Sequence, residues 1–128
     1  MILLWDSSDM EVELTFVDDG NQEIVRWQAD RTLARDMLTF IHRELATRGL
    51  TYGDIQGIGV FRGPGSFTGL RIGITVLNTW ARAEHIPIVG ADDVEWKETC
   101  LARLGDGADD GVVLPEYGAP ARTTKPRK

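Results

Sequence analysis

Hydrophobic and polar positions along the first quarter of the chain predict three strands. Residues 2–5 form a short apolar run, which is typical of a strand buried on both faces. Residues 11–18 alternate strictly between apolar and polar positions, which predicts a half-exposed strand, and residues 23–29 are rich in strand formers. With Asp19-Gly20-Asn21 as a turn, these segments predict an antiparallel meander.

From Asp30 onward the hydrophobic period becomes that of a helix, and Gly49 marks its end. We expect an amphipathic helix over about residues 32–48, with an apolar stripe formed by Leu33, Met37, Phe40, Ile41 and Leu45. The remaining pattern predicts further elements in the order strand, helix, strand, helix. Their expected ranges are residues 55–61, 67–84, 86–90 and 92–104.

A meander followed by helix-linked strands predicts an α/β domain with a mixed sheet and right-handed crossovers. This architecture is that of an RNase-H-like or actin-like (ASKHA) half. We assign residues 1–104 to this single domain and residues 105–128 to a loop and a basic flexible tail. A chain of 128 residues with 42% hydrophobic and 27% charged residues suits one such domain.

The net charge of −6 is unevenly distributed. From Pro115 to the end, four basic residues oppose one acidic residue, so this tail carries about +3 and the rest about −9. Nucleic-acid binding depends on neutralising phosphates, so an acidic body argues against direct RNA or DNA binding by the core. Only the basic tail could contribute a contact to a nucleic acid.

The sequence carries no sign of export or membrane insertion. No apolar run approaches the length of a membrane helix, and no basic segment precedes the short hydrophobic N-terminus. Cys100 is the single cysteine and cannot form an internal disulfide, so we expect a reducing, cytoplasmic location. We interpret Cys100 as a buried helix residue rather than a nucleophile.

A glycine-rich turn joins the predicted strand 55–61 to the helix 67–84. Backbone N–H groups at a helix N-terminus suit an anion, so this turn is either structural or a weak anion site. Its spacing excludes a Walker P-loop, because no lysine follows the last glycine, and it is one residue too long for a dinucleotide fingerprint. The residues of this candidate site are Gly63, Gly65, Ser66 and Thr68.

The helix over residues 67–84 has two apolar stripes on nearly opposite sides, one led by Leu70 and the other by Ile72. A helix lying on a sheet needs only one. Either the first helix covers the second stripe through Met37 and Ile41, or both helices share a surface that faces a partner. We favour the second interpretation, with a partner interface formed by Met37, Phe40, Ile41, Gly69, Ile72, Gly73, Val76 and Trp80.

The stretch Gly63-Pro64-Gly65-Ser66-Phe67-Thr68-Gly69-Leu70-Arg71-Ile72-Gly73 resembles the signature of the TsaB (YeaZ) family. The strand ending in Asp6-Ser7-Ser8 also fits this family, and the resemblance covers roughly residues 1–104. It implies an actin-like fold whose first two helices pack against the equivalent pair of the catalytic paralogue TsaD. It further implies a role in placing threonylcarbamoyl on the adenosine next to the tRNA anticodon.

The resemblance implies a non-catalytic scaffold rather than an enzyme. It predicts no cofactor bound by this chain alone, with ATP, a metal and threonylcarbamoyl-adenylate belonging to the complex. The expected partners are a TsaD-like catalytic subunit, a TsaE-like ATPase and, indirectly, tRNA. An isolated chain with an exposed apolar helix face is also expected to form a homodimer through that face.

Two departures from the family pattern stand out. Family members usually have a second actin-like domain, for which this chain has no room, so we interpret it as a minimal form. The segment Leu114-Pro115-Glu116-Tyr117 nevertheless resembles the Pro-x-Tyr element near the family's C-terminus. Where the first helix of the family tends to begin with histidine, this chain has Asp30-Arg31-Thr32.

The alternative from another functional class is a small nucleotide-binding or hydrolytic (glycopeptidase-like) enzyme that uses the Gly63–Gly69 turn. His42 and His85 lie on separate segments, so we interpret them as surface residues and predict no metal site. Asp6 sits where an actin-like enzyme would orient a metal-bound water. No companion carboxylate is placed by spacing, so a solvated strand end is the simpler interpretation.

Overall fold

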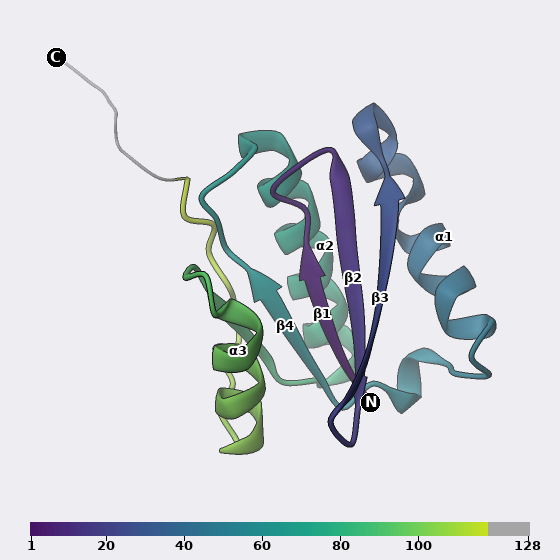
Figure 1. The fold of residues 1–128 in the computed structure, drawn as a ribbon, viewed down its shortest axis with the longest axis vertical. Helices are drawn as coiled ribbons and strands as arrows, with labels where there is room; N and C mark the ends of the chain where they lie inside the picture. Colours follow the sequence, from purple (N-terminus) through teal and green to yellow (C-terminus); the bar gives the residue numbers. More distant parts are fainter. Residues whose placement is uncertain (118–128) are drawn as a thin grey trace, which may run out of the picture.

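The fold is built on a five-stranded sheet with the strand order β3-β2-β1-β4-β5 (Figure 1). The computed structural model describes residues 1–117. Along the chain, the elements are β1 (Ile2–Asp6), β2 (Glu11–Asp18), β3 (Asn21–Gln28), the 3-10 turn η1 (Asp30–Thr32), α1 (Leu33–Ala46), the 3-10 turn η2 (Tyr52–Asp54), β4 (Gly57–Phe61), α2 (Phe67–Glu84), β5 (Ile88–Ala91) and α3 (Trp96–Gly105).

The central strand β1 joins an antiparallel half of the sheet to a parallel half. It runs antiparallel to β2, which pairs antiparallel with β3, and parallel to β4, which pairs parallel with β5. The predicted meander, mixed sheet and α/β class are therefore confirmed. Leu3, Leu4 and Trp5 of β1 have no exposed surface, as expected for a strand buried on both faces.

Helices α1 and α2 cover one face of the sheet, and α3 covers the other (Figure 1). On the α1 and α2 side, Phe40 lies between Trp5 and Trp27, with ring centroids 6.4 and 4.6 Å away. On the α3 side, a smaller cluster includes Leu4 and Cys100. None of the helices within residues 1–117 is long and apolar enough to cross a membrane.

The prediction that β2 is half exposed holds only at its start, where Glu11 is exposed and Glu13 partly exposed. Thr15 and Val17 occupy the face expected to meet solvent, yet they are only 0% and 6% exposed. Val17 belongs to the cluster on the α3 side of the sheet. The apolar–polar alternation of β2 predicted a solvated face. A local pattern could not show that this face is covered, because the helix that covers it begins some eighty residues later in the chain.

Three predicted elements begin at least two residues later than expected, and the first of these is the strand predicted from residue 55, which begins at Gly57. The strand expected from residue 86 begins at Ile88, directly after Pro87, which has no N–H to donate to a neighbouring strand. The helix expected from residue 92 begins at Trp96, because residues 92–95 form a turn in which the Trp96 N–H donates to the Asp93 carbonyl over 3.2 Å. The bounds predicted for α2 match the structure.

Residues 109–117, the C-terminal strap, pack against the domain instead of forming part of a loose tail. The Asp110 N–H donates to Ile88 O, and the Gly90 N–H donates to the Asp110 carboxylate, so the strap covers the outer edge of β5. Val113 is 2% exposed and belongs to the main core. The rest of the predicted loop and flexible tail, residues 118–128, lies outside the described residues.

Candidate functional site

The glycine-rich turn before α2 lies directly against the β1–β2 turn. The Ser66 N–H donates to the Ser8 carbonyl over 2.7 Å, and a side chain at Gly65 would overlap Ser8. Gly63 has a φ of 125°, which favours glycine, and a side chain there would overlap the carbonyl of Glu116 in the strap. These glycines allow the backbones of the glycine-rich turn, the β1–β2 turn and the strap to approach one another closely.

The first turns of α2 are tied to the end of β1 by a buried hydrogen-bond chain. Trp5 Nε1 donates to Ser7 Oγ over 3.0 Å, and Ser7 Oγ donates to the Gly69 carbonyl over 2.8 Å. A Cβ atom at Gly69 would overlap the Ser7 carbonyl, and one at Gly73 would overlap Ser7 Oγ. The helical glycines do admit a close neighbour, but this neighbour belongs to the same chain.

The turn itself has a clear structural role. Ser66 is the N-cap of α2, and its Oγ accepts a hydrogen bond from the Gly69 N–H over 3.3 Å. Thr68 is exposed beside it. With Gly63 and Gly65 packed against the strap and Ser8, the turn aims and caps the helix, while anion binding there stays a prediction.

Most residues of the predicted partner interface are buried inside this chain. Phe40 stacks on Trp27, and Trp80 packs edge-on against Tyr52 with ring centroids 4.9 Å apart. The buried members are Met37, Phe40, Ile41, Gly73 and Trp80. They cannot touch a partner while the core is intact, so the prediction is corrected for these five. The other interpretation, in which the first helix covers the whole second stripe through Met37 and Ile41, holds only in part, because Ile72 and Val76 of that stripe stay partly exposed.

Gly69, Ile72 and Val76 of the predicted interface remain partly exposed on α2. On α1, Leu38 is 51% exposed. We call the exposed side of α1 and α2 around Leu38, Ile72 and Val76 the helix face. Leu38 was missed because it lies off the amphipathic stripe of α1. An apolar residue off such a stripe is itself the signal that could have found it.

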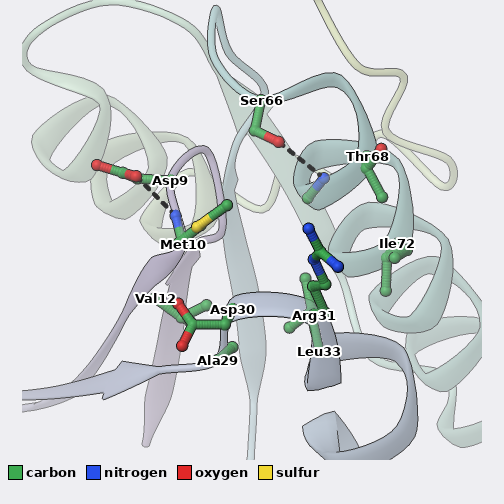
Figure 2. A pocket seen from close by; sticks show the side chains of 11 residues that line it. Asp9, Met10, Val12, Ala29, Asp30, Arg31, Leu33, Ser66, Thr68 and Ile72 are labelled. Carbon is green, nitrogen blue, oxygen red and sulfur yellow. Dashed lines mark hydrogen bonds between the residues drawn. The ribbon is translucent and has the colours of Figure 1, made fainter.

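A cavity of about 320 Å³ adjoins the helix face where η1 and the β1–β2 turn meet the start of α2 (Figure 2). Its apolar lining includes Val12, Ala29 and Leu33, which are buried, and Ile72, which also belongs to the helix face. Polar side chains surround this lining. They are Arg31, Ser66 and Thr68 on the α2 side, and Asp9 and Asp30 on the other.

The charged groups at this cavity differ in how well they are paired. Asp9 Oδ1 accepts from the Met10 N–H over 2.7 Å, and Asp30 Oδ1 accepts from Gln28 Nε2 over 2.6 Å. Within residues 1–117, the Arg31 side chain makes no hydrogen bond or ion pair. Figure 2 shows its guanidinium pointing toward the start of α2. Arg31 is therefore the charged side chain of this cavity that has no partner within residues 1–117, and it is exposed.

The residues considered for enzyme chemistry are scattered. His42 and His85 are exposed, as predicted. Asp6 Oδ1 accepts the Ser8 N–H over 2.9 Å and so helps to shape the β1–β2 turn. In the part of the chain that the structure describes, no group of three His, Cys, Asp or Glu residues is placed to hold a metal.

Cys100 is fully buried, as predicted, and burial raises the pKa of its thiol to about 11. Because the thiolate is the reactive form, the native protein at pH 8 is expected to react with iodoacetamide at least about 100-fold more slowly than the urea-unfolded chain. Mass spectrometry of timed samples measures both rates. Labelling of the native protein at the unfolded rate would contradict this burial.

The model of a protein family described as TsaD, tRNA N6-adenosine threonylcarbamoyltransferase, matches residues 23–99, more than half of the chain. The chain belongs to this family. Over 89 residues it is 30% identical to the tRNA threonylcarbamoyladenosine biosynthesis protein TsaB of Escherichia coli, a match covering 70% of this chain and 38% of the relative. Its match to TsaB of Haemophilus influenzae is 28% identical and covers 69% of this chain and 37% of that relative.

The solved structure of YeaZ from Pseudomonas aeruginosa superposes with a TM-score of 0.67 and 25% identity, covering 83% of this chain and 49% of that one. The TsaB (YeaZ) resemblance inferred from the glycine motif is therefore confirmed. A TsaD of Pelobacter propionicus is 42% identical over 55 residues, 16% of its length. The chain spans less than half the length of each of these TsaB, YeaZ and TsaD relatives.

Proposed function

We propose that this chain is a non-catalytic scaffold that binds a TsaD-type catalytic subunit through the helix face. In this role it supports threonylcarbamoylation of the tRNA adenosine next to the anticodon. The observation that carries the proposal is the exposed apolar surface of the two helices, since Leu38 of α1 is 51% exposed and Ile72 and Val76 of α2 are partly exposed. The TsaB relatives are named for tRNA threonylcarbamoyladenosine biosynthesis, and this supports the choice of process.

The helix face suits another helix pair. Thr75 and Thr79 are exposed on α2 close to Val76, so short side chains surround the apolar centre. Short side chains let a second helix approach closely, and an apolar centre with a polar border is typical of protein interfaces. A family member with the same fold offers an equivalent pair of helices to meet it.

In this proposal, ATP, a metal and threonylcarbamoyl-adenylate are bound by the partners, and a TsaE-type ATPase and tRNA join through the complex in the cytoplasm. The assignment is supported by the glycine-rich turn, where Ser66 already caps the Gly69 N–H and no lysine follows. The alternative hypothesis, a small enzyme that uses the Gly63–Gly69 turn, predicts that the isolated protein binds ATP or ADP. Calorimetry of the isolated chain should therefore show no nucleotide binding, and a saturable titration lost on changing Ser66 and Thr68 would favour the rival.

Changing Ile72→Arg tests the helix face directly. A charged side chain at the centre of an apolar interface is expected to weaken binding at least tenfold, which would remove co-purification with a TsaD-type partner. Because Ile72 is only partly buried, the variant should keep the circular dichroism spectrum of the wild-type protein. The measurement is capture of the tagged chain co-expressed with the TsaD-type protein.

Val94→Arg is the matched control, because Val94 is 99% exposed in the turn before α3, on the other face of the sheet. This control should co-purify as well as the wild-type chain. The proposed interface is wrong if Ile72→Arg also retains the partner, or if Val94→Arg is the variant that loses it.

A further inference from the structure

The cavity beside Arg31 is continuous with the helix face, since Ile72 lines the cavity and also belongs to that face. A partner packed over Ile72 would therefore also cover the mouth of the cavity. Met10, at the rim, is 57% exposed, so apolar surface continues beyond α2 onto the β1–β2 turn. The docking surface suggested by the two helices thus extends toward the strand end of the domain.

The size and lining of the cavity fit an inserted side chain. The cavity has a volume of about 320 Å³. Its buried apolar floor is formed by Val12, Ala29 and Leu33. An apolar cavity of roughly 150 Å³ already holds a benzene ring. One large aliphatic or aromatic side chain therefore fits here together with some of its own backbone, which is the form that central anchors take at protein interfaces.

The charged side chains around the cavity favour one sign of charge in the partner residue that lies next to the inserted apolar side chain. Asp9 and Asp30 have hydrogen-bond donors of their own, whereas the Arg31 guanidinium has no partner within residues 1–117 and points toward the start of α2 (Figure 2). The positive end of the α2 dipole lies on the same side and favours the same sign of ligand charge. A carboxylate placed there would satisfy Arg31 through a charge-assisted hydrogen bond.

We propose that this cavity receives a large apolar side chain of the TsaD-type partner, flanked in the partner by an aspartate or glutamate that pairs with Arg31. This inference rests on the proposed function and names a second contact for the same interface. A single carboxylate presented by a protein suits the site better than a free polyanion such as a nucleotide. Asp9 and Asp30, across the cavity, would repel a multiply charged phosphate group.

The test compares Arg31→Ala with Arg26→Ala in calorimetric titrations against the TsaD-type partner. Arg26 is a matched arginine on β3 whose side chain is 55% exposed beside Glu13. We expect Arg31→Ala to weaken binding about tenfold and Arg26→Ala less than about twofold. Added salt should weaken binding of the wild-type chain more steeply than binding of Arg31→Ala, because one ion pair is absent from the variant.

A second variant probes the apolar anchor without removing charge. Thr68→Trp places a bulky ring at the exposed rim of the cavity. It is expected to weaken binding of the TsaD-type partner about tenfold and to leave the salt dependence of that binding unchanged. The cavity proposal is overturned if Arg31→Ala and Thr68→Trp both bind as the wild-type chain does while Ile72→Arg does not. The helix face would then stand alone. Wild-type binding by all three variants would overturn the proposed function as well.

Discussion

Replacing Gly73 with alanine is expected to lower the free energy of unfolding by about 3 kcal/mol, although only one methyl group is added. The new Cβ would overlap Ser7 Oγ and lie 2.5 Å from Trp5 Nε1. Both atoms belong to the buried hydrogen-bond chain that ties β1 to α2, so neither can move away without leaving a polar group unpaired. Urea denaturation followed by tryptophan fluorescence measures the change.

Gly105→Ala is the control, since nothing lies within 4 Å of a Cβ atom at that position near the end of α3. Helix propensity alone favours alanine over glycine by about 1 kcal/mol, so the two variants should differ in sign. A Gly73→Ala protein as stable as the wild-type protein would contradict the close approach of β1 and α2. The sequence pattern predicts Gly73 at a partner interface, whereas Gly73 is buried in the structure.

Replacing Asn78 with alanine is expected to destabilise the protein by about 2 kcal/mol and to release the C-terminal strap. The Asn78 side-chain amide donates to Val113 O over 2.9 Å and accepts from the Val113 N–H over 2.8 Å. Val113 is buried, so the variant leaves two backbone groups without partners. Denaturation measures the energy, and hydrogen exchange of the Val113 amide measures release.

Thr75→Ala provides the control for Asn78, because Thr75 is exposed one turn earlier on the same helix. It should leave both the stability and the exchange of the strap unchanged. If Asn78→Ala behaved like this control, the strap would not be held by α2. The expected outcome instead makes residues 109–117 an integral part of the domain rather than a loose tail.

The order and type of the elements could be predicted because they depend on local periodicity. The period of the apolar residues changes from two to 3.6 near Asp30, and the bounds of α2 follow from its cap residue Ser66 and its apolar repeats. The exposure of β2 could not be predicted in this way. Thr15 and Val17 are buried on the side that α3 covers, and that helix is far away in the sequence.

The residues of the candidate site could likewise be predicted only in part from local periodicity. Periodicity identified Ile72 and Val76 as apolar positions off the main stripe of α2, and these remain partly exposed. Periodicity could not show that Met37 and Ile41 are buried in the core of the same chain. Arg31 was not singled out because it lies in a short 3-10 turn, where Asp30 has a left-handed φ of 50° and the helical pattern does not yet apply.

The homodimer expectation depended on a broad apolar stripe shared by both helices. Much of that stripe is buried, including Met37, Phe40 and Trp80, so the helix face is smaller than the sequence suggested. Homodimerisation therefore stays a prediction. A smaller apolar centre near Arg31, which has no partner within residues 1–117, is better suited to a partner with complementary charge than to an indiscriminate apolar contact.

Hydrogen exchange of the chain with and without a TsaD-type partner tests the proposed binding surface most directly. Binding through the helix face should slow exchange in α1, in α2 and in η1 beside the cavity, while α3 on the opposite face should exchange as in the free protein. This is the predicted result. Protection confined to α3, or no protection at saturating partner, would contradict it.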